Sequence, residues 1–207
     1  NKVIVPLNHD SIFFKNKKKY NLSEKRIRAF LSQNDAEIGI GLYGEKRNVY
    51  KGKNFVSLLN SDKRRNIHLG MDLFTETEKK IIAPFDGKIV ISHNNFEKYD
   101  YGPTIVLEHK INSEIKFYTL YGHLSKNSLK DSPVGKKIKK GHHFANLGSF
   151  DLNGNWPSHL HFQIIIELMD EKYNFPGVAE ENLWSTWKKI SPNPNLILKI
   201  PETFFQK

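Results

Sequence analysis

The chain of 207 residues contains no cysteine, and this absence limits the kinds of site that it can build. Without thiols there is no disulfide framework and no thiolate metal site, although the compartment stays open. No stretch approaches the ~20 consecutive apolar residues that a membrane-spanning helix needs. The glycine-containing segment 39–44 is not followed by Gly-Lys-Ser or Gly-Lys-Thr, which excludes a phosphate-binding loop. Imidazole and carboxylate groups remain as the candidate metal ligands.

The composition is that of a soluble globular protein, with 38% hydrophobic, 12% aromatic and 26% charged residues. This length buries one good core, or one core and a small appendage. The net charge of +10 is concentrated near the start, where residues 1–66 hold 15 Lys and Arg against 6 Asp and Glu. A solvated basic surface explains this excess. The alternative is contact with an anionic polymer, such as a cell-wall glycan, through residues 15–28 and 63–65. No nucleic-acid motif is present, so we expect no nucleic-acid partner.

The hydrophobic pattern predicts a mainly β protein, an antiparallel sheet of the barrel-sandwich kind with a small helical N-terminal appendage. The helix is expected from its N-cap, Ser23, to about Gln33. A glycine-weakened strand is expected within 37–44, and a hairpin-like pair within 134–148. From residue 172 we expect an irregular tail with one short helix near 180–189. The chain is thus interpreted as a basic extension, residues 1–60, and a domain, residues 61–207.

A His-x-His pair, His159 and His161, precedes an apolar run and is the strongest single feature of the chain. On a strand, residues two apart share a face and lie ~6.6 Å apart, so both imidazoles can point at one spot. A catalytic zinc needs about three protein ligands, which His68, Asp72 and one member of the pair supply. As a regular strand, His68 and Asp72 would stand ~13 Å apart. Gly70 permits a bend that brings them together.

Three motifs follow one another along the chain: HLGMD at 68–72, YGHL at 121–124 and HLHF at 159–162. Together with segments 83–90, 105–109 and 134–141, they resemble the lysostaphin-type zinc endopeptidases, which cut peptide cross-links of bacterial cell walls. The resemblance covers about residues 66–168. Three motifs in the right order are far more specific than any one of them.

The resemblance implies one zinc ion per chain, held by His68, Asp72 and His161, the second histidine of the pair. His123 and His159 then become catalytic imidazoles that are not ligands and that transfer protons at the metal-activated water. Which of the two is the general base is left open. Tyr118 or Tyr121 is expected to supply a further donor. The remaining histidines are interpreted as structural or surface residues: His9, His93, His109, His142 and His143.

Segments 40–50, 153–158 and 191–196 resemble one branch of that family, found in long bacterial polypeptides beside kinase-like and class III aminotransferase domains. Members of this branch need not act on cell wall. Where the wall enzymes have a small, glycine-rich lead into the His-x-His strand, this chain has Trp156, which either stacks on substrate or packs within its loop. We expect a peptide or peptidoglycan substrate. The alternative is a non-catalytic or differently specific zinc-binding module that acts on a non-wall substrate within a larger metabolic or regulatory assembly.

Two further alternatives concern the segment 134–148 and the location of the protein. The segment also resembles the swaddling hairpins of biotinyl and lipoyl carrier domains, but the modified lysine flanked by Met or Asp is missing. The opening segment 3–7 is too short to be a signal peptide, and a removed signal would leave no trace. Localisation is therefore open, with the cell envelope or secretion expected if the substrate is peptidoglycan.

Overall fold

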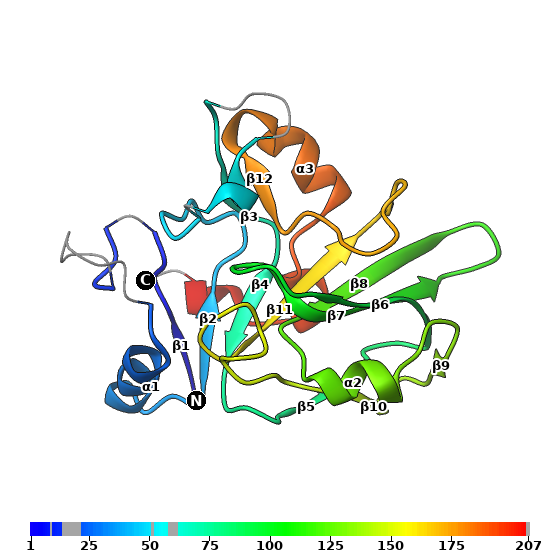
Figure 1. Cartoon of the computed structure of the whole chain (residues 1–207), viewed down its shortest axis with the longest axis horizontal. Coiled ribbons are helices and arrows are strands. Elements are labelled where there is room, and N and C mark those ends of the chain that lie inside the picture. Colours follow the sequence, from blue (N-terminus) through cyan, green and yellow to red (C-terminus); the bar gives the residue numbers. More distant parts are fainter. Residues whose placement is uncertain (9, 14–21, 51, 58–61, 206–207) are drawn as a thin grey trace.

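The computed structural model describes residues 1–8, 10–13, 22–50, 52–57 and 62–205. In this part of the chain a large sheet forms the centre of the molecule, with the strand order β1-β2-β4-β11-β8-β7-β6-β9 (Figure 1). The β1·β2 pair is parallel, whereas the other neighbours are antiparallel, so the expectation of a mainly β, antiparallel fold is confirmed. In sheet order the strands are Lys2–Ile4, Ile38–Gly41, Met71–Phe74, His159–Ile165, Lys116–Gly122, Gly102–Lys110, Gly87–Asn95 and Lys137–Ile138.

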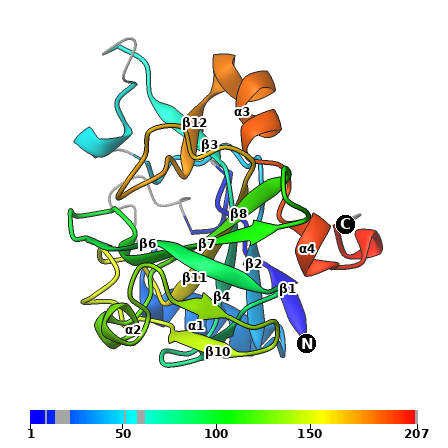
Figure 2. The ribbon, with the colours of Figure 1, turned by 90° about the vertical axis from the view of Figure 1, so that its right-hand side faces the viewer.

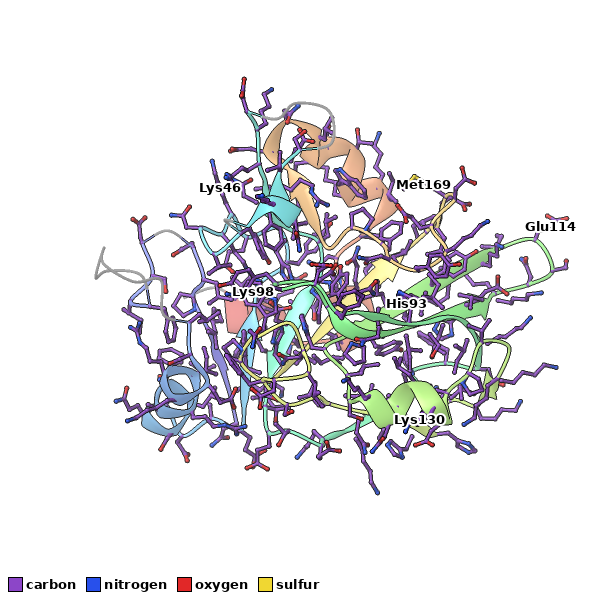
Figure 3. The ribbon with its side chains drawn as sticks, in the orientation of Figure 1. Lys46, His93, Lys98, Glu114, Lys130 and Met169 are labelled. Carbon is purple, nitrogen blue, oxygen red and sulfur yellow. The ribbon has the colours of Figure 1, made fainter. Side chains whose placement is uncertain are left out.

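Smaller elements cover the two faces of this sheet. On one face lie α2 (Lys126–Asp131) and the antiparallel pair β5 (Lys80–Ile82) and β10 (His143–Asn146); on the other lie α3 (Trp184–Ile190) and the antiparallel pair β3 (Arg65–His68) and β12 (Val178–Glu180) (Figures 1 and 2). Glu114, labelled in Figure 3, marks the tip of the long β7–β8 hairpin. The other helices are α1 (Glu24–Gln33), α4 (Asn195–Leu198), η1 (Lys53–Phe55), η2 (Glu181–Leu183) and η3 (Glu202–Phe205).

Strand β11 lies in the middle of the sheet, and all of its residues are buried. Successive side chains of a strand point to opposite faces. Leu160 and Phe162 therefore join the apolar core under α2 and β10, with Ile89, Leu107 and Tyr121. The two histidines of the strand point to the opposite face, toward β3 and β12. Alternation along one strand thus separates the core from the site.

The N-terminal region forms one edge of the sheet, where β1 and β2 lie next to β4. Helix α1 begins as predicted, because the Ser23 hydroxyl accepts a hydrogen bond from the Arg26 amide at 3.4 Å. Its buried residues Ile27 and Leu31 pack with Val5, Leu7 and Phe74. In addition, the α1 carboxylate of Glu24 accepts a 2.6 Å hydrogen bond from the amide of Ser158, directly before β11. Residues 1–60, which were expected to form an extension, therefore contribute β1 and β2 to the sheet, and Glu24 contacts the residue before β11.

Two expectations about local structure are wrong. The segment 134–148 is not a hairpin, because β9 pairs with β6 and β10 pairs with β5. The tail from residue 172 is more ordered than expected: it contains the expected helix as α3, and also β12 and α4. Strand β12 has three residues and follows a Pro-Gly pair, so it is too short for a period-2 pattern to reveal. It matters because it pairs with β3 beside the site.

Candidate metal centre and active site

Three buried side chains converge where β3, β4 and β11 meet: His68, Asp72 and His161. Nε2 of His68 lies 3.0 Å from Nδ1 of His161 and 3.2 Å from Oδ1 of Asp72. The third side of this triangle, from Nδ1 of His161 to Oδ1 of Asp72, is also 3.2 Å. Four-coordinate zinc with bonds of ~2.1 Å to nitrogen and oxygen separates its ligand atoms by roughly 3.4 Å. The triangle has the size that such an ion requires.

The hydrogen bonds on the far sides of the two rings show why a cation fits this triangle. Nδ1 of His68 lies 3.0 Å from the Leu42 carbonyl oxygen, and Nε2 of His161 lies 2.9 Å from Oε1 of Gln163. Each ring nitrogen must donate to these acceptors, which assigns the tautomers and leaves lone pairs on the two facing nitrogens. Burial lowers the pKa of His68 to about 3, so this ring is neutral. In these tautomers the lone pairs of the two facing nitrogens point toward Oδ1 of Asp72 and toward each other.

Asp72 is ionised in spite of its burial. Burial alone would raise its pKa, but the His68 ring and the Arg47 guanidinium beside it hold that pKa well below its usual value. Its Oδ1 faces the two imidazoles, while Oδ2 accepts a 2.6 Å hydrogen bond from Nη1 of Arg47. The negative charge that a divalent cation needs is thus present at neutral pH.

His68 and Asp72 meet across a bend at Gly70, as expected from the sequence. The chain bends at residues 69–70 between β3 and β4, but Gly70 does not have a positive φ. A Cβ at this position would lie 2.5 Å from Cε1 and 2.6 Å from Nε2 of His161, and 2.8 Å from the Phe162 carbonyl oxygen. Glycine is needed here because the His161 ring occupies the space of a side chain.

His123 and His159 lie beside this triangle, with their ring centroids 4.2 Å apart. Nδ1 of His123 donates to the Asn153 carbonyl at 3.0 Å, and Nδ1 of His159 donates to the Pro157 carbonyl at 2.6 Å. In both rings Nε2 is left as the proton acceptor, and that of His159 lies 3.7 Å from Oδ1 of Asp72. Burial lowers the pKa of both histidines, so both are neutral at pH 7.

His123 follows the end of β8 in a left-handed backbone conformation, with a φ of 62°. A side chain other than glycine is strained there by about 1–3 kcal/mol unless its surroundings hold it. The amide of His123 donates to the Tyr101 carbonyl at 2.8 Å, and its carbonyl accepts from Gly148 at 2.8 Å. Two backbone hydrogen bonds and one side-chain hydrogen bond therefore fix the ring beside His159.

The model of Peptidase family M23 matches residues 66–174, slightly more than half of the chain. The chain belongs to peptidase family M23. No curated protein matches it. Among solved structures, the catalytic domain of the antimicrobial peptidase lysostaphin from Staphylococcus simulans is similar at 26% identity, with a TM-score of 0.42, over 59% of this chain and 80% of that domain. A zinc-containing peptidase from Vibrio cholerae is similar at 25% identity and a TM-score of 0.40, over 52% of this chain and 29% of that one.

In this M23 chain the candidate metal centre lines a cleft together with several aromatic side chains, which form its aromatic wall. Besides the five site residues, the lining includes Tyr50, Phe55, Tyr99, Tyr101 and Trp156. The Trp156 ring contacts those of Tyr50 and Tyr99, at centroid distances of 6.2 and 5.4 Å, and it also lines a neighbouring cleft. Trp156 is therefore both packed against other rings and accessible to a ligand in the cleft.

None of the helices in the described part of the chain has the length and the apolar composition of a membrane span.

The two tyrosines proposed from the sequence do not lie at the cleft. Tyr121 points to the opposite face of the sheet from His161 and packs on Phe144 and Phe162. Tyr118 is buried in the core with Leu120 and Ile165, near the far end of β8. Their expected role as donors is not supported by this placement.

Tyr101, which lines the cleft beside the histidines, was missed by sequence reasoning. Its ring centroid lies 5.0 Å from that of His161 and 5.9 Å from that of His123, and its hydroxyl donates to the Phe175 carbonyl at 3.1 Å. The only available signal was its position directly before Gly102 and the strand β7. Gln163, the partner of His161, was detectable as the next residue on the same face of β11.

Four other histidines lie away from the five site residues: His93 contacts Tyr173, His109 contacts Asp86 and Thr119, His143 contacts Asn146, and His142 is exposed. His9 and residues 14–21 of the basic segment lie outside the described residues. In the described part of that segment, Arg26 donates to the Phe13 carbonyl and Arg28 pairs with Glu24 at 2.7 Å. These arginines therefore have protein partners, and a contact with an anionic polymer stays a prediction.

Proposed function

We propose that this protein is a zinc-dependent endopeptidase, with peptidoglycan cross-links or stem peptides as its substrate class. The observation that carries the proposal is the buried triangle of three potential ligand atoms, Nε2 of His68, Oδ1 of Asp72 and Nδ1 of His161, which lie 3.0–3.2 Å from one another. Membership of peptidase family M23 supports the reaction class. The donor set fits one zinc ion, because it offers two imidazole nitrogens and one carboxylate oxygen and leaves a coordination position open.

Zinc bound at this site would supply Lewis acidity toward the scissile carbonyl and would bring the pKa of a bound water toward ~7. The histidines of the protein would then accept and donate the protons. Nε2 of His123 or His159 would accept the proton of the attacking water, and the ring that accepts it would return it to the leaving amine. The lowered pKa values of both rings keep them neutral and ready to accept a proton at pH 7. Their Nδ1 hydrogen bonds to backbone carbonyls leave Nε2 as the nitrogen that exchanges the proton.

The aromatic wall supports binding of the substrate next to these groups. Trp156 and Tyr99 are shared by the main cleft and the neighbouring one, so a bound peptide that crosses from one to the other passes both rings. Aromatic faces bind apolar side chains and extended backbones by packing. Residues 15–28 and 63–65 are proposed to attract an anionic wall polymer, and residues 61–207 to hold the catalytic groups.

Hydrolysis tests the proposal directly. Zinc-loaded protein is incubated with cell-wall sacculi, with synthetic cross-link and stem peptides, and with non-wall peptides of the same length, while new amino termini are counted. We expect release from sacculi and wall peptides, loss of release with a chelator and recovery with added zinc. The His161→Ala variant serves as the matched control without activity. Release from non-wall peptides alone would overturn the substrate class, and absence of release by zinc-loaded protein from every substrate would favour the non-catalytic module.

A further inference from the structure

A buried arginine from the N-terminal region, Arg47, contacts the candidate ligand Asp72. Arg47 is 3% exposed, and its guanidinium lies between two carboxylates. Nη1 donates to Oδ2 of Asp72 at 2.6 Å, and Nε donates to Oε2 of Glu45 at 2.9 Å. Nη1 also reaches the Tyr50 hydroxyl at 3.1 Å, and Nη2 reaches the Leu42 carbonyl at 3.3 Å. Each of the three guanidinium nitrogens thus has a protein acceptor.

The fold makes room for this arrangement. Gly41 of β2 pairs directly with Asp72 of β4, and a Cβ on Gly41 would lie 2.7 Å from Nη2 of Arg47 and 3.1 Å from Cβ of Asp72. A side chain at position 41 would therefore displace the guanidinium from Asp72. Glu45 is fixed in turn, since its Oε1 accepts from the Leu7 amide at 2.9 Å.

The same loop, residues 42–47, holds a second candidate ligand. The Leu42 carbonyl accepts from Nδ1 of His68 at 3.0 Å as well as from Arg47. The amide of His68 donates to the Glu45 carbonyl at 3.1 Å, and the Gly44 amide donates to the His68 carbonyl at 2.8 Å. One loop thus orients the imidazole of His68 and the carboxylate of Asp72 together.

We propose that Arg47 is a positioning residue of the metal centre, which occupies Oδ2 of Asp72 so that Oδ1 alone faces the ion. The inference rests on the proposed zinc site. With Oδ2 free, the carboxylate could bind through both oxygens and fill the position that the reacting water needs. Arginine suits this task because its planar fork holds two carboxylates in fixed directions, which the single ammonium of a lysine does not. Partners of this kind behind a metal ligand typically change metal affinity by about 10–100-fold.

A buried ion pair that only stabilises the fold is the competing explanation. Taking an arginine and two carboxylates out of water is costly, and apolar residues of similar volume often stabilise a core as well or better. A purely structural pair would affect unfolding of the metal-free protein without changing how Asp72 binds an ion. The two explanations therefore differ in the coordination of the bound metal.

The test uses the full chain with Arg47→Lys and Arg47→Gln, and Lys46→Gln as the matched control. Lys46, labelled in Figure 3, is 55% exposed and pairs with Glu181 on the surface. Zinc affinity is measured by competition with a chromophoric chelator. The visible spectrum of the cobalt-substituted protein reports the coordination number, because four-coordinate Co²⁺ absorbs much more strongly than five- or six-coordinate Co²⁺. Urea unfolding of the metal-free variants is measured in parallel.

We expect zinc affinity to fall by about 10–100-fold in Arg47→Gln and by less in Arg47→Lys, with weaker cobalt absorption in both and no change in Lys46→Gln. Because Arg47→Lys keeps the positive charge, the test relies on this variant if Arg47→Gln does not fold. The proposal is overturned if the folded variants bind zinc within twofold of wild type and keep the wild-type cobalt spectrum, whatever their stability. A wild-type protein that does not bind zinc would instead refute the proposed function.

Discussion

Replacing Gly70 by alanine adds one methyl group behind His161 and changes no candidate ligand. The new Cβ would lie 2.5 Å from Cε1 of His161 and 2.8 Å from the Phe162 carbonyl oxygen, where ordinary contacts begin at 3.4 Å. The ring would have to move by roughly 0.9 Å, whereas zinc–ligand distances tolerate only about 0.2 Å. The Phe162 carbonyl belongs to the central strand β11 and cannot give way as a flexible side chain does. The clash therefore falls on the candidate ligand.

The expected cost can be bounded. Overpacking of a tight interior costs about 1–3 kcal/mol, while a glycine-to-alanine change at a compatible φ returns about 0.4–1 kcal/mol through the unfolded chain. The free energy of unfolding should thus fall by roughly 1–2 kcal/mol, which lowers the melting temperature by about 2–8 °C in a chain of this size. Zinc affinity should fall at least about tenfold, as it does when the support of a metal ligand is disturbed.

Gly52→Ala is the matched control for this substitution. Its φ is −66°, and the nearest heavy atoms to a new Cβ would be at 3.6–3.9 Å, so alanine fits there. Thermal unfolding of the metal-free proteins and chelator competition for zinc give both quantities. A Gly70→Ala protein that keeps the melting temperature and the zinc affinity of Gly52→Ala would refute the placement of His161 against Gly70.

Three other outcomes are expected. His123→Ala should retain zinc and fold while hydrolysis slows by ~100-fold or more, the size of a lost acid–base contribution; loss of zinc instead would make His123 a ligand. The free energy of unfolding of the metal-free protein should be highest above the pKa of ~6.5 that histidines have in the unfolded chain. It should decline as the pH falls toward the lowered folded-state pKa values of His68, His123 and His159, because the unfolded chain then binds more protons. The decline is up to about 1.4 kcal/mol per pH unit for each group. Urea unfolding at several pH values measures this slope, and equal stability at pH 7 and pH 5 would contradict it. Neutralising Lys63 and Arg64 should weaken salt-sensitive binding to sacculi and leave small-peptide hydrolysis unchanged; salt-independent binding would return these residues to a solvated surface.

The sequence predicts much of this architecture because its signals are local. The N-cap of α1 at Ser23 and the strand within 37–44, observed as β2, follow from local residue patterns. The His-x-His pair, by its period of two, predicts that His159 and His161 share a face, and the structure places both rings on the site side of β11. The meeting of His68 and Asp72 across a bend at Gly70 was expected too, whereas the close approach of the His161 ring to Gly70 was not.

What sequence reasoning missed depends on contacts between distant segments. Arg47 lies 25 residues before Asp72, and only the β2·β4 pairing brings its guanidinium to that carboxylate. In the sequence it was one basic residue among many in a basic region. The sequence also did not show which tyrosine reaches the site, Tyr101 or Tyr121. Alternation shows that neighbouring residues of a strand face opposite ways, but it does not show which face is the core. The pairings of β9, β10 and β12 could not be predicted either, because each joins strands that are distant in the sequence.

Zinc content in a pair of variants tests the central claim most directly. His159 and His161 lie two residues apart on one strand, yet only His161 completes the triangle with His68 and Asp72. Elemental analysis of purified protein should find one zinc per chain in wild type and in His159→Ala, and little or none in His161→Ala, because two ligands hold zinc much less well than three. Equal zinc content in the two variants would contradict the assignment of the metal centre.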